Sequence, residues 1–279
     1  MKKFSKRFVG IMLTVIMALS LAVGCGSSQG TDSKTEGNEK TEGDKKVIGV
    51  SLLNCTHVFY NNIQKGLENK AEELGWELII QDAAADANKQ LSQVQDFITQ
   101  DVDAIIICPT NSAGSKSMVE LADEADIPVF TMDIESEIEA CIQREKGFTD
   151  YLAENAPDVN VVDIQNYSGD QQKAADVMQN MLLKHENIDV VFAVGDPAAI
   201  GAQSSIDAAG KDTLIIGYDG NPEGIEAIKA GGNWVADVAQ DPTAIAEKTL
   251  EAVKTKLEGG TPEKEIKIEP YIIDKENAE

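Results

Sequence analysis

The sequence has few of the residues on which metal and catalytic sites most often depend. Its 279 residues include 2 histidines, His57 and His185, and 4 cysteines. No CxxC or His-rich spacing indicates a metal site. The three cysteines beyond the N-terminal region, Cys55, Cys108 and Cys141, form an odd set, so we expect free thiols, with a Cys55–Cys108 disulfide as the alternative. We expect no metal centre and no bound cofactor.

Positive charge is also scarce. Lys and Arg number 24 against 48 Asp and Glu, which gives a formal net charge of -24 at pH 7. Binding to nucleic acid requires a surplus of Lys and Arg on one face, and an anionic membrane surface attracts such a surplus as well. The composition therefore argues against nucleic acid as a partner and against attraction to an anionic lipid surface.

The sequence motifs of several enzyme classes are missing from Val47 onward. No GxGxxG follows the first expected strand, and no GxxxxGK[ST] phosphate loop or GxSxG elbow occurs in this part of the chain. Two histidines leave little room for a Ser-His-Asp triad. We therefore predict that the protein is not an enzyme.

The N-terminal 24 residues are typical of a secretory signal peptide. They contain four basic residues near the start, no acidic residue, and an apolar run over residues 8–23. That run is shorter than the roughly 20 residues that a spanning helix needs. Residues 21–25, Leu-Ala-Val-Gly-Cys, resemble a bacterial lipobox, which implies cleavage before Cys25 and lipid attachment to its thiol. An uncut signal anchor is the alternative.

The segment after Cys25 has the composition of a flexible tether. Residues 26–46 are polar or glycine and include no aromatic and no aliphatic side chain. Such a segment cannot bury enough apolar surface to order itself. We therefore expect residues 1–24 to be a signal peptide and residues 25–46 to be a lipidated cysteine with a tether, which places the rest of the chain outside the cytoplasm at the membrane.

Short runs rich in Val and Ile recur from Val47 onward and predict strands. The expected strands cover residues 47–53, 76–82, 104–108, 127–132, 159–165, 190–195, 214–219, 234–239 and 266–273. Most runs are continuously apolar, as strands covered on both faces require. Apolar residues at helical spacing separate the runs, as at Ile63, Leu67 and Ala71. This alternation predicts an α/β fold with parallel sheets.

Polar and aromatic side chains follow the expected strands, at the edge where parallel sheets bind ligands. They are His57, Phe59, Tyr60, Asp133, Asp196, Asp219 and Gln240. A carboxylate accepts hydrogen bonds from adjacent hydroxyls, and an aromatic face covers the C–H patches of a sugar ring. Each residue alone is ordinary in a turn or a core. Together they predict a site for a neutral, hydroxyl-rich ligand.

An ordered set of segments resembles the ribose- and galactose-type substrate-binding proteins of ABC sugar importers. The segments are VSL at 50–52, FY at 59–60, CPT at 108–110, IPVFTMD at 127–133, VMQN at 177–180, FAVGD at 192–196 and GYDG at 217–220. The resemblance implies a type I periplasmic-binding-protein fold, in which two Rossmann-like lobes with parallel sheets close around a solute by a hinge. The first lobe would comprise residues 47–133 plus 241–260, and the second 134–240 plus 261–279.

The resemblance also implies roles for individual residues. Phe59 and Tyr60 would stack on the sugar, and His57 would lie near a position that is usually a polar amide. The residues that would bind sugar hydroxyls are Asp133, Arg144, Asp196, Asp219 and Gln240, with Arg144 opening an Arg-x-x-Gly-Phe motif.

The chain departs from the family pattern at several of these positions. Ile134 stands where ribose binders usually have Arg, and Gly195 replaces a common Asn. The aromatic residue expected at Gly169 is replaced by Tyr167, two positions earlier. No particular sugar is therefore predicted.

A larger departure lies between Asp133 and Arg144. Only residues 134–143 intervene, where the family has a strand and helix of the first lobe, a crossover and the first strand of the second lobe. The apolar spacing predicts one helix over residues 134–155, weakened at Gly147. The second lobe would then lack a central strand, whose neighbours must pair directly or leave backbone groups unpaired. We expect an incomplete or rearranged second lobe.

These observations predict a lipid-anchored, extracytoplasmic binding protein that captures a monosaccharide and delivers it to the membrane permease of an ABC importer. The missing strand supports an alternative, in which a binding-deficient protein of the same fold presents itself to a membrane sensor.

Overall fold

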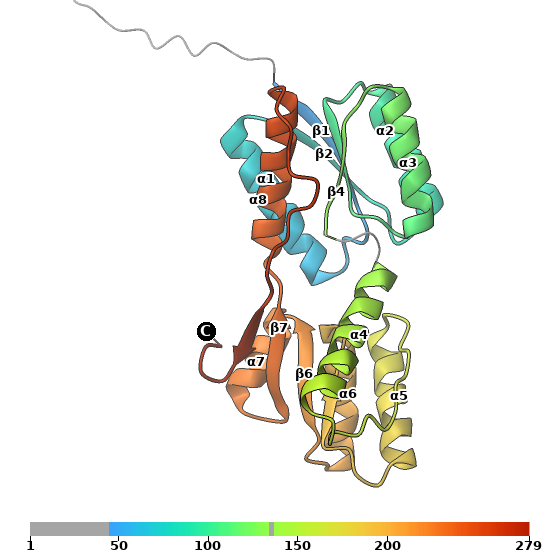
Figure 1. Ribbon diagram of the computed structural model, residues 1–279, viewed down its shortest axis with the longest axis vertical. Helices are drawn as coiled ribbons and strands as arrows, with labels where there is room; N and C mark the ends of the chain where they lie inside the picture. The colour runs from blue at the N-terminus through green and yellow to red at the C-terminus, as the bar shows by residue number, and fades with distance from the viewer. Residues whose placement is uncertain (1–44, 134–136, 279) are drawn as a thin grey trace, which may run out of the picture. The chain divides into compact units, whose positions relative to one another are not determined.

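The computed structural model describes residues 45–133 and 137–278 (Figure 1). The expected signal peptide, Cys25 and nearly all of the expected tether lie outside these ranges. The elements in chain order are β1 (Val47–Leu52), α1 (Val58–Leu74), β2 (Glu77–Asp82), α2 (Ala87–Thr99), β3 (Ala104–Ile107), α3 (Ser112–Glu124), β4 (Val129–Thr131), α4 (Glu137–Asn155), α5 (Gln171–Lys184), β5 (Val190–Phe192), α6 (Asp196–Ala209), β6 (Leu214–Asp219), α7 (Pro222–Ala230), β7 (Trp234–Ala239), α8 (Pro242–Leu257) and β8 (Tyr271–Asp274).

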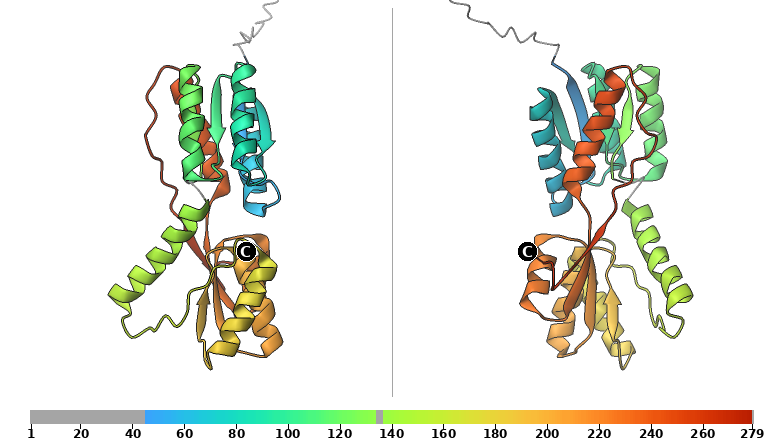
Figure 2. Two further views of the ribbon diagram at one scale, coloured as in Figure 1. Left: turned by 90° about the vertical axis from the view of Figure 1, so that its right-hand side faces the viewer. Right: turned by 60° about the vertical axis from the view of Figure 1, so that its left-hand side comes forward.

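The first sheet is fully parallel, with strand order β2-β1-β3-β4. Alternate residues of its strands face two separate cores. Helices α1 and α8 cover one face of the sheet, and α2 and α3 cover the other (Figure 2). Ile48 and Ile106 pack with α1 and α8, whereas Ile105 and Ile107 pack with α2 and α3. Every residue of β3 is buried. The continuous apolar runs in the sequence follow from this cover on both faces.

The loops at the carboxyl edge of the first sheet are fixed by helix caps. His57 caps α1 by accepting a hydrogen bond at Nδ1 from the Phe59 amide, at 3.3 Å. Asp86 accepts from the Asn88 and Lys89 amides at the start of α2. These side chains satisfy amides that have no partner within the helix, so they set where each helix begins.

The second sheet has strand order β5-β6-β7-β8 and is mixed, because β8 runs antiparallel to β7. Its core is formed with α5, α6 and α7 and includes the fully buried Trp234. Burial along β6 alternates, unlike that along β3. Leu214 is 40% exposed and Ile272 is 53% exposed, so one face of this sheet is incompletely covered.

Two strand predictions are wrong. Residues 159–165 form no strand, and residues 266–270 are irregular, with a strand only at Tyr271–Asp274. The first case has a physical cause. A Val-rich segment becomes a strand only where a neighbouring backbone pairs with it, and the strand expected beside this segment is missing from the chain. The expectation of parallel sheets is also wrong at β8.

The other predicted strands are confirmed, with ends shifted by up to three residues. The single helix expected over residues 134–155 is confirmed over Glu137–Asn155, and residues 134–136 lie outside the described ranges. It continues through Gly147 without a break, and the expected weakening at this glycine stays a prediction. The family elements expected between Asp133 and Arg144 are replaced by this one helix.

Cys55, Cys108 and Cys141 form no disulfide in the described ranges, so the alternative Cys55–Cys108 disulfide is not formed. Cys108 is buried, and its Sγ donates to the Met132 carbonyl at 3.4 Å. Burial, together with the nearby Asp82 carboxylate, raises the pKa of the Cys55 thiol.

Within residues 45–133 and 137–278, no helix combines the length and the apolar character needed to cross a membrane.

Gly49 in β1 lies directly under the buried ring of Phe97, and a Cβ there would lie 2.5 Å from Cγ of the ring. We expect Gly49→Ala to lower the free energy of unfolding by about 1–3 kcal/mol, because the core has no room for the added methyl. Gly147→Ala is the matched control, since a Cβ there meets nothing within 4 Å. It should raise stability by about 0.5–1 kcal/mol, as Gly-to-Ala changes do inside helices. Urea unfolding followed by circular dichroism measures both; equal effects would contradict this packing.

Candidate functional site

A narrow cleft of about 40 Å³ lies where residues of both sheets and of α4 meet. Its lining residues are His57, Phe59, Tyr60, Asp133, Ala140, Cys141, Arg144, Tyr167, Val194, Gly195, Pro197, Asp219 and Gln240. The lining contains seven of the eight residues proposed from the sequence as ligand-binding; Asp196 is the one outside it. Most of these side chains follow the carboxyl ends of strands, where parallel sheets bind ligands.

One wall of the cleft is aromatic. Phe59 and Tyr60, in the first turn of α1, pack edge to face with ring centroids 5.3 Å apart. The rings of His57 and Tyr60 meet in the same manner at 5.8 Å. Phe59 and Tyr60 are only 3% and 6% exposed, because both belong to the first core as well as to the cleft. This wall is therefore rigid.

Arg144 projects from α4 and is held by three groups of the second sheet. Its Nη1 donates to the Val194 carbonyl at 2.8 Å and to Asp219 Oδ1 at 3.2 Å. Its guanidinium carbon lies 3.8 Å from the centre of the Tyr218 ring, an arrangement that favours a cation. Burial opposes the charged form most strongly, but Asp219 together with Tyr218, Cys141 and Asp133 outweighs it, and the pKa of Arg144 is raised. Arg144 therefore brings a fixed positive charge to the cleft.

Two carboxylates of the cleft sit on backbone that is unusual for residues other than glycine. Asp133 has φ 74° and Asp219 has φ 116°. Tyr60 donates its hydroxyl to Asp133 Oδ2 at 3.4 Å, and Gln240 Nε2 donates to Asp219 Oδ1 at 2.9 Å. Burial raises the pKa of Asp219, although Arg144 and His57 act to lower it. Strained backbone of this kind persists where the surrounding contacts fix it, often at functional sites.

Tyr167 lines the cleft and is not among the side chains predicted from the sequence to bind the ligand. A Cβ added to Gly195 would lie 3.2 Å from the Tyr167 hydroxyl. The hydroxyl therefore lies beside the space that a side chain at position 195 would enter. Two departures from the family pattern in the sequence indicate this contact. Gly195 stands in place of Asn, and the aromatic residue lies two positions early.

Asp196 lies beneath the cleft and not in its lining, fully buried beside Asp237. A Cβ on Gly217 would lie 2.9 Å from Asp196 Oδ1 and closer still to Asp237 Oδ2, so both oxygens face one small space. Within the described part of the chain, neither oxygen accepts a hydrogen bond from an N–H or O–H donor. A proton shared by the two carboxyls satisfies both.

The remaining oxygens of this acid pair fix the loop after β6. Asp196 Oδ2 accepts from the Asn221 amide at 2.7 Å, and Asp237 Oδ1 accepts from the Gly220 amide at 2.9 Å. Burial, and next the hydrogen bond that protonated Asp196 donates to Asp237, raise the pKa of Asp196 to about 9. The protonated pair thus positions the loop that begins at Asp219, so Asp196 supports the cleft from below.

No metal site accompanies the cleft in the described residues, because no group of three His, Cys, Asp or Glu side chains in them could hold an ion. What the cleft offers is a set of hydrogen-bonding groups and aromatic faces. Carboxylates that accept, a guanidinium and an amide that donate, and flat apolar rings suit a ligand with several hydroxyls.

Comparison with known proteins identifies a family and several relatives of this chain. Residues 48–142 and 136–261 match the family described as periplasmic binding protein domain. The ribose import binding protein of Bacillus subtilis is 31% identical over 299 residues, covering 94% of this chain and 96% of that protein. The D-apiose import binding protein of Actinobacillus succinogenes is 26% identical over 79% of this chain and 85% of its own.

Solved structures share the fold. A periplasmic solute binding protein of an ABC transporter from Actinobacillus succinogenes 130z, with bound D-allose, has a TM-score of 0.78 at 23% identity and covers 84% of this chain and 99% of its own. A solute binding protein from Bacillus halodurans, with bound myo-inositol, has a TM-score of 0.74 at 23% identity, covering 84% and 96%. These likenesses support the type I fold expected from the sequence.

The same comparisons bear on the missing segment. The alignment with the Bacillus subtilis protein runs over 299 residues, more than the 279 of this chain, so the relative contains residues that this chain lacks. The two ranges matched by the family overlap at residues 136–142, in and just before the start of α4. The shortfall expected from the sequence therefore lies at this point.

The buried acid pair predicts a pH dependence of stability. Because the pKa of Asp196 is about 9 when folded, against about 3.9 when unfolded, its contribution is fully present below about pH 4 and is lost as the pH rises through about 9. The free energy of unfolding should fall over this range by up to about 1.4 kcal/mol per pH unit from this group.

Asp196→Asn tests this directly, because the amide can donate to Asp237 and accept from the Asn221 amide without needing a proton. The variant should show a flatter stability profile and exceed the wild-type stability at pH 8–9, measured by urea unfolding at each pH. The exposed Asp212→Asn change is the control for loss of one negative charge. A wild-type slope in Asp196→Asn would refute the shared proton.

Proposed function

Because the chain belongs to the periplasmic binding protein domain family, we propose that it captures a monosaccharide outside the cytoplasm and delivers it to the permease of an ABC importer. One observation carries the proposal. Seven side chains that the sequence predicts to bind a sugar, from segments as far apart as His57 and Gln240, converge on one cleft. The named relatives bind or import ribose and apiose, and the fold neighbours hold allose and myo-inositol, all of them polyhydroxylated.

Each group of the cleft has a chemical role in this proposal. Asp133 and Asp219 accept hydrogen bonds from sugar hydroxyls, and Arg144 and Gln240 donate to sugar oxygens. Phe59 and Tyr60 cover an apolar face of the ring. Arg144 Nη1 and Asp219 Oδ1 already lie 3.2 Å apart. A sugar hydroxyl can therefore accept a hydrogen bond from Arg144 and donate one to Asp219 while both charged groups stay close to their present positions.

The mechanism is capture without covalent chemistry. A cleft of about 40 Å³ has room for a few waters, whereas sites for small molecules are typically about 300 Å³ or more. A sugar therefore enters only when the two walls separate. We propose that residues 47–133 plus 241–260 move as one lobe against residues 134–240 plus 261–279, and that closure buries the sugar.

The location of the protein follows from the N-terminal sequence in this proposal. Cleavage before Cys25 and lipidation of its thiol would anchor the chain, and residues 26–46 would let the binding body reach a permease. The alternative of a binding-deficient partner of a membrane sensor has the missing strand as its only support. The convergence of the site residues favours sugar capture.

Sugar binding is tested by calorimetric titration of the protein with a panel of pentoses, hexoses and inositols, alongside the fluorescence of Trp76 and Trp234. A saturable response to at least one of them is expected. Failure to bind any member of the panel would refute the proposal and favour the binding-deficient alternative. Hydrogen exchange with and without sugar then reports whether the second sheet gains protection.

Asp133 is expected to be a direct ligand of the sugar. Loss of a hydrogen bond to a charged group costs about 1.5–3 kcal/mol, so Asp133→Asn should weaken affinity by roughly tenfold to a hundredfold. The exposed Asp123→Asn change, on α3, should leave affinity unchanged and serves as the charge-matched control. Equal affinities for the two variants would remove Asp133 from the site.

Tyr167 is expected to contribute through its hydroxyl, which lies beside Gly195. Tyr167→Phe keeps the ring and removes one donor, so affinity should fall by about twofold to tenfold, the effect of a neutral hydrogen bond. Tyr151→Phe is the matched control, because Tyr151 is 65% exposed on α4 and does not line the cleft. Calorimetry of the two variants with the best-bound sugar measures the difference, and no loss in Tyr167→Phe would exclude a role for the hydroxyl.

A further inference from the structure

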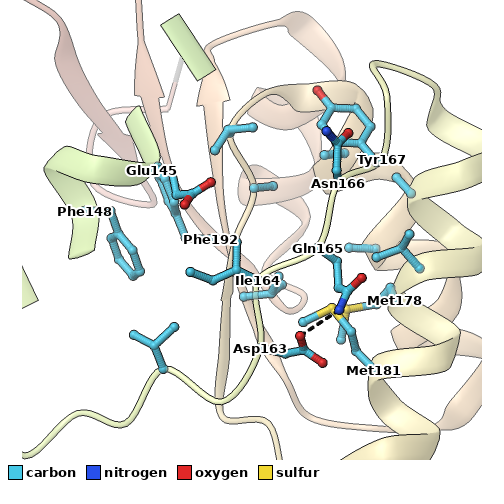
Figure 3. Close-up of a pocket in the computed structure, with 18 of the residues that line it drawn as sticks. Glu145, Phe148, Asp163, Ile164, Gln165, Asn166, Tyr167, Met178, Met181 and Phe192 are labelled. Carbon is cyan, nitrogen blue, oxygen red and sulfur yellow. Dashed lines mark hydrogen bonds between the residues drawn. The ribbon is translucent and has the colours of Figure 1, made fainter. Parts of the chain in front are cut away.

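A second cavity, of about 770 Å³, lies beside the second sheet (Figure 3). It is bounded by α4, by the irregular segment at residues 159–165, by α5 and by β5. We call residues 159–165 the open segment and the cavity the slot. The slot is separate from the sugar cleft, although Cys141, Tyr167 and Val194 contribute to both.

The walls of the slot are apolar. Phe148 of α4 stacks on Phe192 of β5 with ring centroids 4.5 Å apart, and Met178 of α5 lines the opposite side (Figure 3). Four apolar side chains of the open segment remain 41–54% exposed: Val159, Val161, Val162 and Ile164. Exposed apolar residues this close together mark an interaction surface more often than a solvated loop.

Both long edges of the slot carry backbone groups without a strand partner. In the described part of the chain, β5 is the edge strand and pairs only with β6. The backbone of residues 160–165 forms no backbone–backbone hydrogen bond in that part either. A strand inserted between these two edges could hydrogen-bond to both.

The open segment runs alongside β5 and in the same direction. At the C-terminal end of α5, which leads into β5, Asp163 accepts a hydrogen bond from Lys184 and pairs with His185. Beyond the end of β5, the Tyr167 hydroxyl lies beside Gly195. Between these two contacts the segment forms no helix, strand or turn, and residues 160–165 have no backbone partner in the described ranges.

We propose that a second copy of this chain fills the slot, by a reciprocal exchange of the open segments. Each copy inserts its open segment between the β5 edge and the open segment of its partner. The strand order across the pair is then β5, the partner's open segment, the open segment, and the partner's β5. A two-fold axis perpendicular to the sheet generates this order and makes the two exchanged segments antiparallel neighbours.

A second copy fits better than a small apolar molecule for two reasons. Only a polypeptide backbone supplies the donors and acceptors that the two edges need, since an apolar ligand would leave them unpaired. The chain also carries the matching element itself, because the open segment is rich in β-branched residues and has no strand partner in the described ranges. One exchange therefore satisfies both copies.

Charge affects how strongly the two copies associate. The open segment contains a single acidic residue, Asp163, which is already paired with Lys184 and His185. The net charge of -24 on each chain nevertheless repels the partner at long range. Because the Debye length falls from about 30 Å at 0.01 M salt to about 8 Å at 0.15 M, dimerisation should strengthen as salt is added.

Sedimentation of the full chain over a range of concentrations and salt tests the proposal. The expected result is a monomer–dimer equilibrium whose dimer fraction rises with both. Val162→Pro should abolish the dimer, because proline removes an amide that the exchanged strand needs, while the monomer has no backbone hydrogen bond there to lose. Ile266→Pro, in another exposed irregular segment, is the matched control and should dimerise like the wild type.

Disulfide trapping is a second test, and it does not require that Val162→Pro folds well. Near the two-fold axis the exchanged segments lie side by side, so Val162→Cys should form an intermolecular disulfide under mild oxidation, whereas Ile266→Cys should not. A protein that is monomeric at all concentrations, or a dimer that persists unchanged in Val162→Pro, would overturn the exchange. Sugar titration of Val162→Pro is an independent readout, because the exchange does not depend on the proposed function.

Discussion

The position of α4 on the second sheet depends on one side chain more than on any other polar group described here. Arg144 reaches from the middle of the helix to the Val194 carbonyl, the Asp219 carboxylate and the Tyr218 ring. One turn further on, Phe148 adds a stacked contact with Phe192. A helix that stands in for several family elements is thus fixed by a charge and an aromatic pair. The same charge forms part of the proposed sugar site, so binding and architecture share a residue.

The sequence predicted the parts of the molecule that local pattern determines. Strands buried on both faces, such as Ala104–Ile107, need continuous apolar runs, and those runs were found. The long helix through Arg144 was predicted because its apolar spacing continues across the position where the family pattern breaks. The cleft was predicted because residues that follow parallel strands meet at one edge. In each case the regular geometry of a strand or helix determines where residues at a given sequence spacing lie in the fold.

What failed depended on partners that local pattern does not identify. Residues 159–165 have the composition of a strand but no neighbouring strand to pair with, so their high β-propensity does not produce a strand. Asp196 was expected to face the ligand, but Asp237, distant in sequence, holds it beneath the cleft. Tyr167 enters the cleft through an irregular segment whose path no periodicity encodes. These outcomes depend on contacts between distant residues.

The return of the chain to each sheet has a consequence for the order in which the protein can form. The first core is completed by Ala246, Leu250 and Val253 of α8, and the second sheet by Tyr271–Asp274. A chain that emerges from its N-terminus therefore finishes neither core until nearly all of it is available. A partly made chain therefore exposes apolar strands that have no completed core to pack against. In both cores, the element that completes the packing is among the last to be made.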